Sequence, residues 1–432
     1  MSKSLVMTIF WFRRDLRLFD NTALHNSLKN SKEVQPIFIF DSEIIDELEK
    51  NDPRLNFIYD ELLKINNELK KFNSSLKIYQ GKPLEIINEI ITSYKITSFY
   101  FNKDYEPYAI KRDNEISKLL ADNHINLYTF KDQVIFEENE VVKNDGLPYT
   151  VFTPFKNKWL HKFNENKIVI NTNSENSNLK NSNHKFPSRE DISLIKSIIT
   201  VPNFDIEMVS DYDKTRNFPG LDATSKIGPH LRFGTLSIRQ IVKKVTPLND
   251  IYLSELIWRE FFMQILWHFP KVVHQNFKSK YDGVKWRNNE DDFKKWCKGE
   301  TGYPFVDAGM RELNETGFMH NRVRMITAGF LCKHLLIDWR WGEAYFAKKL
   351  LDYELASNNG NWQWSAGTGC DSAPYFRVFN PTEQIKKFDK QHNYINKWVK
   401  DLNELTYPSP MVEHKFARNR ALETYKIGLS KI

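Results

Sequence analysis

Short apolar runs alternate with helical patterns along the first 130 residues, and this alternation limits the possible folds most. The first two runs are almost wholly apolar, as central strands of a parallel sheet are. Apolar residues between the second and third runs recur at helical spacing after Pro53. The series predicts a doubly wound parallel sheet in an α/β, Rossmann-like domain. The runs cover residues 6–12, 35–40, 76–79, 98–101 and 126–130.

A sheet of this kind suggests a dinucleotide site, but the usual phosphate-binding loop is missing. Before Pro219 the only glycines are Gly81 and Gly146, so neither GxGxxG nor a P-loop is present. The segment Arg13–Arg17 follows the first strand, at the edge where such sheets bind ligands. The alternative interpretation of this segment is a salt-bridge cluster at a helix end.

The chain of 432 residues is long enough for two or three domains. Residues 167–185 are dominated by Asn and Ser, which predicts an exposed linker that buries no apolar surface. After Pro202 the patterns are helical. We therefore expect an α/β domain over 1–132, an interdomain linker over 133–202 and an all-helical domain over 203–432.

The net charge of +7 lies in the helical part of the chain. From Asn203 onward 34 basic residues accompany 27 acidic ones, and the preceding residues carry 28 of each. Nine of the eleven tryptophans also lie after Asn203. A basic, Trp-rich half favours a polyanion with flat groups, such as nucleic acid. The alternative is that the excess of Lys serves solubility alone.

Several other classes of protein find no support in the sequence. No apolar run reaches about 18 residues, and no signal-peptide pattern precedes the first strand. The three cysteines, which show no CxxC spacing, predict reduced thiols in the cytoplasm and no metal site. Neither HExxH nor GxSxG occurs, so hydrolytic chemistry has no support.

The stretch 352–381 combines acids, amides, indoles and glycines rather than an apolar helical repeat. A polar run, Ser357–Asn361, which we interpret as flexible, precedes Trp362 and Trp364. Glycines let a backbone approach flat or crowded groups closely. We interpret the stretch as part of a ligand site, and the alternative is an aromatic-rich loop that caps a helical bundle.

Two further segments place polar and aromatic residues on shared helix faces. The predicted helix 251–269 carries Glu255, Trp258 and Arg259 on one stripe, and a solvated face seldom includes a Trp. A predicted helix over 318–336 places Asn321, Arg324 and Met325 together with Arg322 one step round, where Arg forks could meet phosphate. The alternatives are a solvated face for the first helix, and for the second a surface Arg pair bound to Asp338 or Glu343.

A third segment, residues 223–228, offers hydroxyls, a Lys and a Gly before a helix. Such a segment is a candidate cradle for a pyrophosphate at a helix N-terminus.

Taken together, these residues resemble the DNA photolyase/cryptochrome family over essentially the whole chain, and class I cyclobutane pyrimidine dimer photolyases in particular. Five blocks match the family in the right order. They are WFRRDLRLFDNTAL at the start, SELIWREFF (254–262), GYPFVDAGMRELNETGFMHNRVRM (302–325), LLIDWRWGE (335–343) and DYELASNNGNWQW (352–364).

The resemblance implies that FAD is bound in the helical domain, with Asn358 beside flavin N5. Three positions depart from the family's commonest pattern, because Lys226, Gly228 and Glu354 stand where Arg, Ser and Asp are frequent. The implied FAD site comprises Tyr212, Thr224, Ser225, Lys226, Ile227, Gly228, Tyr252, Glu255, Arg259, Asn321, Arg324, Asp352, Glu354 and Asn358.

The resemblance also implies light-driven repair of DNA. Reduced FAD, excited by blue light, would pass an electron to a flipped-out pyrimidine dimer, whose ring splits before the electron returns. Catalytic roles fall to Glu255, Asn321 and Asn358. Photoreduction would use Trp362, Trp339 and Trp286, whose alternative role is core packing. The implied lesion and DNA contacts are Glu255, Trp258, Arg259, Asn321, Arg322, Met325 and Trp364.

The implied partner is damaged DNA, duplex or single-stranded, and the implied state is a monomer. A second, antenna chromophore is expected in the α/β domain, near Glu106. Methenyltetrahydrofolate, a deazaflavin and a flavin remain alternatives. A cryptochrome photoreceptor and a 6-4 photolyase are alternative functions, although no long C-terminal tail follows residues 420–426, and the pair His320-Asn321 stands where 6-4 enzymes have two histidines.

Overall fold

The computed structural model describes residues 6–172 and 176–430, and the chain divides into two compact units. Unit 1 comprises Met1–Glu140, His161–Phe204 and Ile227–Pro247. Unit 2 comprises Val141–Leu160, Asp205–Lys226 and Leu248–Ile432. The units therefore differ from the three consecutive ranges expected from the sequence, since 227–247 packs with the sheet and 141–160 packs with the helical unit.

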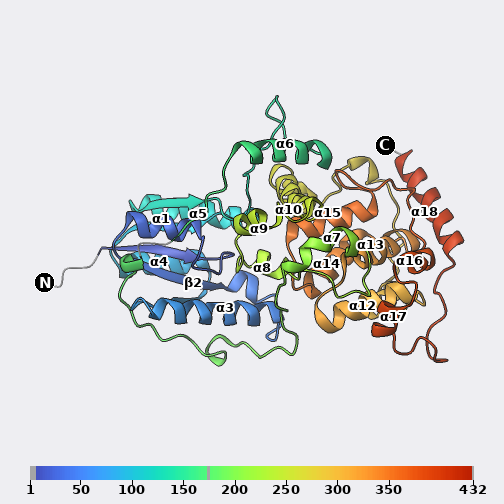
Figure 1. Ribbon diagram of the computed structural model, residues 1–432, viewed down its shortest axis with the longest axis horizontal. Coiled ribbons are helices and arrows are strands. Elements are labelled where there is room, and N and C mark those ends of the chain that lie inside the picture. Colours follow the sequence, from blue (N-terminus) through green and yellow to red (C-terminus); the bar gives the residue numbers. More distant parts are fainter. Residues whose placement is uncertain (1–5, 173–175, 431–432) are drawn as a thin grey trace. The chain divides into compact units, whose positions relative to one another are not determined.

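Unit 1 is built on a five-stranded, wholly parallel sheet with the strand order β3-β2-β1-β4-β5. Figure 1 shows this sheet with β2 labelled. All five strands lie within or overlap the predicted apolar runs. The fully buried β1 lies at the centre, which explains why Thr8, bonded to Ser98, is the only polar residue in its sequence. The strands are β1 (Met7–Phe12), β2 (Val34–Asp41), β3 (Lys77–Gly81), β4 (Ile96–Asn102) and β5 (Asn126–Phe130).

Helices cover both faces of this sheet and bury two separate apolar cores. The core on one face includes residues of α1 and α3, and the core on the other face includes residues of α4 and α5. The predicted α/β doubly wound architecture is thus confirmed. The helices of unit 1 are α1 (Thr22–Asn30), α2 (Ser42–Ile45), α3 (Pro53–Lys70), α4 (Pro83–Ser93), α5 (Pro107–Asp122), α8 (Gly228–Arg232) and α9 (Ile238–Val245), with short turns at Asn176–Asn178 and Glu190–Ile192.

The Asn- and Ser-rich stretch 167–185 contributes to this core, so the prediction that it buries no apolar surface is wrong. Leu179 is buried in the core beneath β2, and the N–H of Lys180 donates to the carbonyl of Val34 at 2.8 Å. Further hydrogen bonds to unit 1, such as those of the Ser182 N–H to the Asn73 carbonyl and of the Asn178 amide to the Leu28 carbonyl, hold a stretch whose composition is otherwise typical of a linker. Residues 173–175 of this stretch lie outside the described residues.

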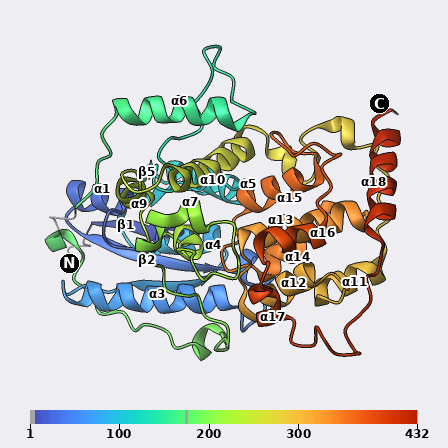
Figure 2. The same ribbon diagram turned by 45° about the vertical axis from the view of Figure 1, so that its right-hand side comes forward.

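Unit 2 is helical, and among its described residues the only β pairing is an isolated bridge between Val142 and Pro148. Helix α15 contacts α10, α13 and α14 (Figure 2). The helices are α7 (Tyr212–Thr215), α10 (Asp250–His268), α11 (Glu290–Lys298), α12 (Pro304–Thr316), α13 (Asn321–Gly329), α14 (Trp339–Lys349), α15 (Leu355–Ala366), α16 (Pro381–Phe388), α17 (Asn393–Trp398) and α18 (His414–Leu429), with short turns at Glu207–Asp211, Pro270–Val273, Ser279–Tyr281 and Phe330–His334.

Helix α6 (Phe152–Glu165) contributes its first part to unit 2 and its last part to unit 1.

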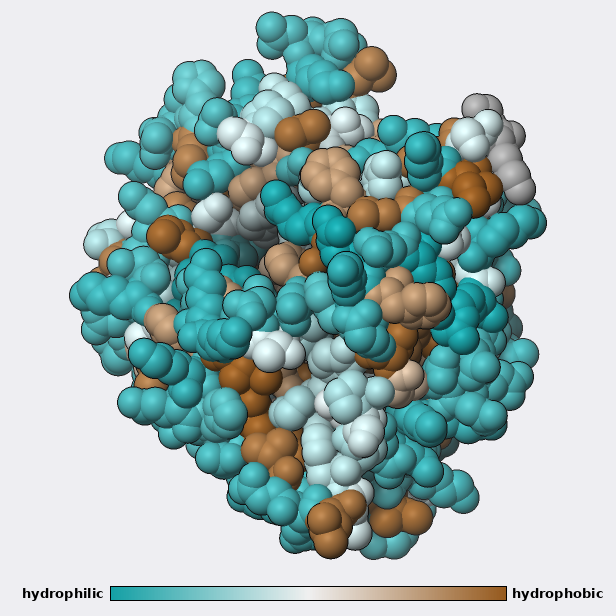
Figure 3. All heavy atoms as spheres, turned by 90° about the vertical axis from the view of Figure 1, so that its right-hand side faces the viewer, coloured by the Kyte–Doolittle hydropathy of each residue, from teal (hydrophilic) through white to brown (hydrophobic). Residues whose placement is uncertain are grey.

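Hydrophilic side chains cover most of the face drawn in Figure 3, and apolar residues are dispersed among them. No helix in the described part of the chain is both long and apolar enough to cross a membrane. Within 6–172 and 176–430, no group of three or more His, Cys, Asp or Glu side chains could hold a metal ion.

Candidate active site

Helix α10 carries the centre of the candidate site, and its ends follow from local sequence. The side-chain oxygen of Asn249 accepts bonds from the N–H groups of Ile251 and Tyr252, which caps the helix. The helix ends at His268, two residues before Pro270, as the pattern predicts. Glu255, Trp258 and Arg259 follow its cap and are all half-buried.

Glu255 forms an ion pair with Arg216 at 2.8 Å, and not with Arg259. Arg259 pairs instead with the buried carboxylate of Glu354 at 3.1 Å. Both of these α10 residues therefore form ion pairs with partners outside the helix. Burial raises the pKa of Glu255 above its usual value, although Arg216 opposes the shift. Arg216 is a site residue that helix periodicity could not reveal, because it lies outside α10.

The candidate phosphate cradle before α8 holds an unpaired hydroxyl. Ser225 lies 2.7 Å from the Tyr252 hydroxyl, and the Tyr212 ring lies edge-on to Tyr252. The Thr224 hydroxyl is buried and has no hydrogen-bond partner among the described residues. An unsatisfied buried hydroxyl is costly, so this site suits a polar ligand.

The next three residues of this segment fall on both sides of the boundary between the units. Lys226 has a positive φ of 57°, pairs with Asp222 at 3.0 Å and lies 4.1 Å from the Phe318 ring centroid. Ile227 and Gly228 belong to unit 1, where Gly228 begins α8. Of the predicted cradle residues, those up to Lys226 therefore belong to unit 2, whereas Ile227 and Gly228 belong to unit 1.

Helix α13 begins at Asn321 rather than at Phe318, because His320 caps it. His320 Nδ1 accepts a bond from the Arg322 N–H at 3.1 Å, which requires that nitrogen to be unprotonated. Burial, with the nearby cations Arg324, Lys226 and Arg322, lowers the pKa of His320 to about 4. The cap is therefore complete near neutral pH.

Two arginines of α13 have fixed partners, whereas Asn321 lies exposed. Arg324 makes two bonds to the Asp352 carboxylate, at 2.9 and 3.2 Å, and so does not pair with Asp338 or Glu343. Arg322 contacts the side chain of Asn217, the neighbour of Arg216.

The Arg322 side chain also meets an aromatic ring and a thioether. Its guanidinium lies 4.3 Å from the Phe388 ring centroid and 3.9 Å from the Met325 sulfur. Arg322 and Met325, which the sequence placed near one another on this helix, are therefore in contact.

Residues 355–366 of the stretch 352–381 form helix α15, so the interpretation of Ser357–Asn361 as a flexible run is wrong. Residues 367–380 form no helix. Asn358 is buried, and its amide donates to the Glu343 side chain at 2.9 Å and to the Glu343 carbonyl at 3.1 Å. Burial raises the pKa of Glu343. A Cβ on Gly360 would lie 2.1 Å from the Phe262 ring, which explains a glycine inside a helix.

The three tryptophans of the expected relay belong to one apolar cluster, with Trp286 at its edge. Trp362 is buried against Gly342, where an added Cβ would lie 2.1 Å from the indole. Trp339 is fully buried, and its indole N–H donates to Asn276 at 2.9 Å. This arrangement is compatible with both the relay and the packing interpretation.

Trp258 and Trp364, the expected lesion contacts, are both half-buried. The Trp258 indole stacks on Phe152 of α6, with ring centroids 3.7 Å apart and planes inclined by 8°. Phe152 lies in the range that we assigned to a linker, although its apolar i, i+3, i+7 spacing with Phe155 and Trp159 could have revealed a packed helix.

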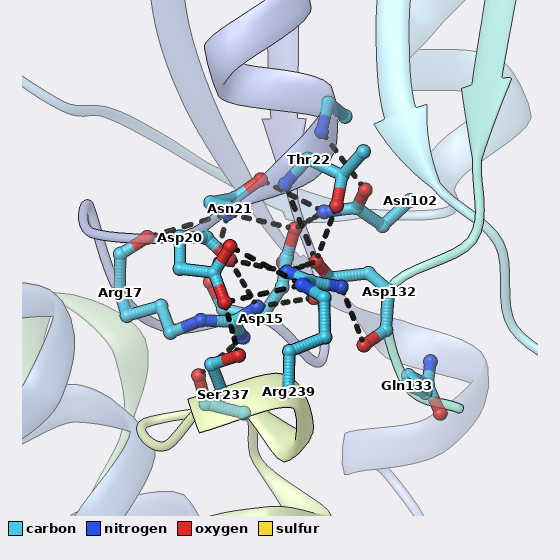
Figure 4. Close-up of polar contacts among 12 residues, drawn as sticks. Asp15, Arg17, Asp20, Asn21, Thr22, Asn102, Asp132, Gln133, Ser237 and Arg239 are labelled. Atoms are coloured by element: carbon cyan, nitrogen blue, oxygen red, sulfur yellow. Dashed lines mark hydrogen bonds and ion pairs between the residues drawn. The ribbon is translucent and has the colours of Figure 1, made fainter. Parts of the chain in front are cut away.

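A buried polar network lies where Arg13–Arg17 follows β1 in unit 1 (Figure 4). Arg17 pairs with Asp132 at 2.6 Å, and Arg239 pairs with Asp132 at 2.8 Å and with Asp20 at 3.1 Å. Burial raises the pKa of Asp15. Burial also opposes ionisation of Asp132, but Arg17 and Arg239 outweigh it and lower the pKa of that carboxyl. The salt-bridge interpretation of this segment is therefore confirmed.

Glu106, the expected antenna contact, already has two cationic partners within unit 1. Its carboxylate accepts bonds from Arg14 at 3.1 Å and from Arg232 at 2.8 Å. A chromophore that binds to Glu106 would contact a carboxylate that already forms ion pairs with Arg14 and Arg232.

Comparison with known proteins agrees with this geometry over both units. Residues 8–173 match the family model described as DNA photolyase, and residues 252–406 match the FAD binding domain of DNA photolyase. The chain belongs to the DNA photolyase family. It is 34% identical to a deoxyribodipyrimidine photo-lyase of Vibrio cholerae, covering 97% of this chain and 99% of the relative.

Solved structures of the photolyase family share the fold. A class III photolyase of Agrobacterium tumefaciens has a TM-score of 0.86 at 30% identity, with full coverage of both chains. A Sulfolobus tokodaii photolyase with two FAD molecules has a TM-score of 0.84 at 33% identity, covering 98% of this chain and all of that one. A Synechocystis cryptochrome has a TM-score of 0.85 at 26% identity, with the same coverage.

Proposed function

We propose that the protein repairs cyclobutane pyrimidine dimers in DNA, using light absorbed by bound reduced FAD. The observation that carries this proposal is α10, whose Trp258 and raised-pKa Glu255 share a stripe beside Tyr252 and the Ser225 cradle. This helix offers a stacking surface and a carboxyl donor next to the segment that fits a cofactor. The curated relative from Vibrio cholerae, a deoxyribodipyrimidine photo-lyase, supports the same lesion class.

The residues of unit 2 fit FAD. The Thr224 hydroxyl, which has no partner in the described part of the chain, and the Ser225 hydroxyl suit the pyrophosphate. The pairs Arg259–Glu354 and Arg324–Asp352 offer polar edges to the rings. When bound, reduced and excited by blue light, FAD supplies the electron that opens the cyclobutane ring and takes it back. The chain's own contribution is to bind the cofactor, to hold Asn358 by its bonds to Glu343 and to exclude water.

Glu255 would hold a proton at the lesion. A pyrimidine presents carbonyl acceptors, and a protonated carboxyl can donate to them whereas a carboxylate cannot. Burial beside Trp258 favours the protonated form, and entry of a flat lesion would add to that burial. Arg216 opposes protonation, so the ion pair at 2.8 Å must loosen when the lesion binds. The nearby Asn321, Arg322, Met325 and Trp364 would complete the pocket around a flipped-out dimer.

The experiment offers each lesion separately. Chemically reduced protein is mixed with a duplex that carries one cyclobutane dimer or one 6-4 photoproduct, and then exposed to blue light. We expect repair of the cyclobutane dimer only. We also expect the protein to act as a monomer, on duplex or single-stranded DNA. Repair of the 6-4 lesion would show a different class, and repair of neither would favour the cryptochrome alternative, which the similarity to a Synechocystis cryptochrome keeps in view.

We also propose a second chromophore in unit 1 that harvests light. The Sulfolobus tokodaii photolyase contains two FAD molecules, with the implication of a novel light-harvesting cofactor in that protein, and this supports a flavin as one candidate. Glu106 is paired with Arg14 and Arg232 mainly through one carboxylate oxygen, so the other oxygen can still accept a bond from a chromophore N–H. Release of chromophores by denaturation, followed by mass spectrometry, would distinguish folate, deazaflavin and flavin.

A further inference from the structure

The first part of α6 presents one apolar stripe to α10. Phe155 packs on Phe261 with ring centroids 5.3 Å apart, and the buried indole N–H of Trp159 donates to the buried Glu260 carboxylate at 2.7 Å. Phe152, one turn before Phe155, stacks on Trp258. The stripe therefore attaches α6 to the same helix that carries the candidate lesion contacts.

Contact between Phe152 and Trp258 is the closest ring stack in this part of unit 2. The centroids lie 3.7 Å apart and the planes are inclined by only 8°, so Phe152 covers one face of the indole. Phe152 itself is 7% exposed. The other ring neighbours of Trp258, Phe261 and Phe262, lie 5.5 and 5.4 Å away and are not parallel to it.

The start of α6 is also attached to the loop that follows α15. The backbone N–H of Phe152 donates to the Asp371 carboxylate at 3.1 Å, and an acid at a helix N-terminus is electrostatically favourable. This loop follows the helix that ends shortly after Trp364. Phe152 is thus tied through its ring to Trp258 and through its backbone to the segment after Trp364.

We propose that Phe152 is a positioning residue for lesion recognition, which fixes the plane of the Trp258 indole so that the exposed part of this half-buried side chain meets the pyrimidine dimer. This inference rests on the proposed function, because it requires Trp258 to contact the lesion. An indole that is half-buried could otherwise rotate between rotamers, and fixing it beforehand lowers the entropic cost of binding. The nearly parallel stack on Phe152 supplies such a restraint.

A different role for Phe152, as a placeholder that leaves when the lesion enters, is disfavoured by its surroundings. To move away, Phe152 would have to break its N–H bond to Asp371 and expose a buried ring. Phe155 and Trp159 hold the following turns of the helix in place. The two roles predict opposite effects of removing the ring, so one variant separates them.

The test measures, on chemically reduced holoenzyme, the dissociation constant for a dimer-containing duplex and the repair per absorbed photon at saturating DNA. Phe152→Leu should raise the dissociation constant about threefold to tenfold, with repair per photon and FAD content unchanged. Phe152→Tyr keeps a planar ring and should bind like the parent protein. Phe155→Leu removes a ring from the same helix without touching the stack, and should leave the dissociation constant unchanged.

Each other outcome overturns the inference in a recognisable way. Tighter binding by Phe152→Leu would show a placeholder, and equal weakening by Phe155→Leu would show a general loosening of α6. If Trp258→Leu binds the dimer normally, the lesion pocket of the proposed function is wrong. If Trp258→Leu weakens binding and Phe152→Leu does not, only the positioning role fails. Should Phe152→Leu not fold, Phe152→Met, of similar volume but non-planar, gives the same comparison.

Discussion

The Glu255 carboxyl illustrates how one residue is balanced between two states. Burial raises its pKa, whereas the Arg216 guanidinium at 2.8 Å stabilises the ionised form. Without DNA the ion pair holds the side chain. In the proposed complex the protonated form becomes useful, because only that form donates to a pyrimidine carbonyl.

Substitution of Glu255 tests this donor role. Glu255→Gln retains an N–H donor of similar shape and should keep most of the repair per absorbed photon, whereas Glu255→Ala removes the donor and should lose more. The affinity for the dimer should fall less than the yield in both variants. FAD content, measured from the visible spectrum, serves as the control. An Ala variant with unchanged yield per bound flavin would contradict the donor role.

Trp362 offers a second test on a single side chain. If it begins the electron relay, Trp362→Phe should abolish photoreduction of oxidised FAD, while repair by chemically reduced protein persists. Flash photolysis and a repair assay measure the two processes separately. Photoreduction at the normal rate would leave core packing against Gly342 as the role of this indole.

Helix α13 depends on a cap that is sensitive to acid. His320 Nδ1 accepts the Arg322 N–H, and a protonated ring could not. The pKa of His320 is about 4 in the folded protein, below the ordinary value of 6.5. The unfolded chain binds this proton more readily than the folded protein does. The contribution of His320 to folding stability is therefore fully present above about pH 6.5 and is lost as the pH falls toward 4.

His320→Asn should remove part of this acid sensitivity, because Asn caps helices through an oxygen that does not titrate. Between pH 7 and pH 5 the parent protein should lose about 2 kcal/mol more unfolding free energy than the variant. Urea unfolding of both proteins at the two pH values measures the difference. Parallel pH profiles would show that His320 does not titrate in this range.

The buried network of unit 1 joins α9 to the loops after β1 and β5. Arg17 and Arg239 both depend on the Asp132 carboxylate. Asp132→Asn should destabilise unit 1 by about 3–5 kcal/mol, because it leaves buried guanidinium charge uncompensated. Guanidinium-induced unfolding measures this loss. The exposed ion pair of Lys71 with Glu68 supplies a control, and Glu68→Gln should change stability by less than about 1 kcal/mol.

For the whole molecule, the uneven charge predicts how DNA binding responds to salt. The net charge of +7 resides from residue 203 onward. The logarithm of the binding constant for lesion DNA should therefore fall steeply and linearly with the logarithm of salt concentration, as counterion release requires. Undamaged duplex should bind much more weakly because flipping a paired base is costlier. Fluorescence anisotropy measures this salt dependence between about 50 and 200 mM salt, where counterion release is usually measured. A binding constant that does not change with salt would exclude an electrostatic interface.

Local pattern alone determined much of this protein. Continuous apolar runs predicted the five strands, because strands of a parallel sheet are buried on both faces. The helical period of 3.6 residues predicted α10 and the helical second half. The order of motif blocks indicated the family. The stripe of Glu255, Trp258 and Arg259 was visible for the same reason, since residues three and four apart share a helix face.

Only the tertiary structure decided which charges meet. Folding brings Arg216 to Glu255 and Glu354 to Arg259, although neither partner lies on helix α10. Spacing also could not show that Leu179 enters the core of unit 1 or that Phe152 covers Trp258. These contacts join residues far apart in the chain. Their geometry depends on how whole elements pack, which no local period encodes.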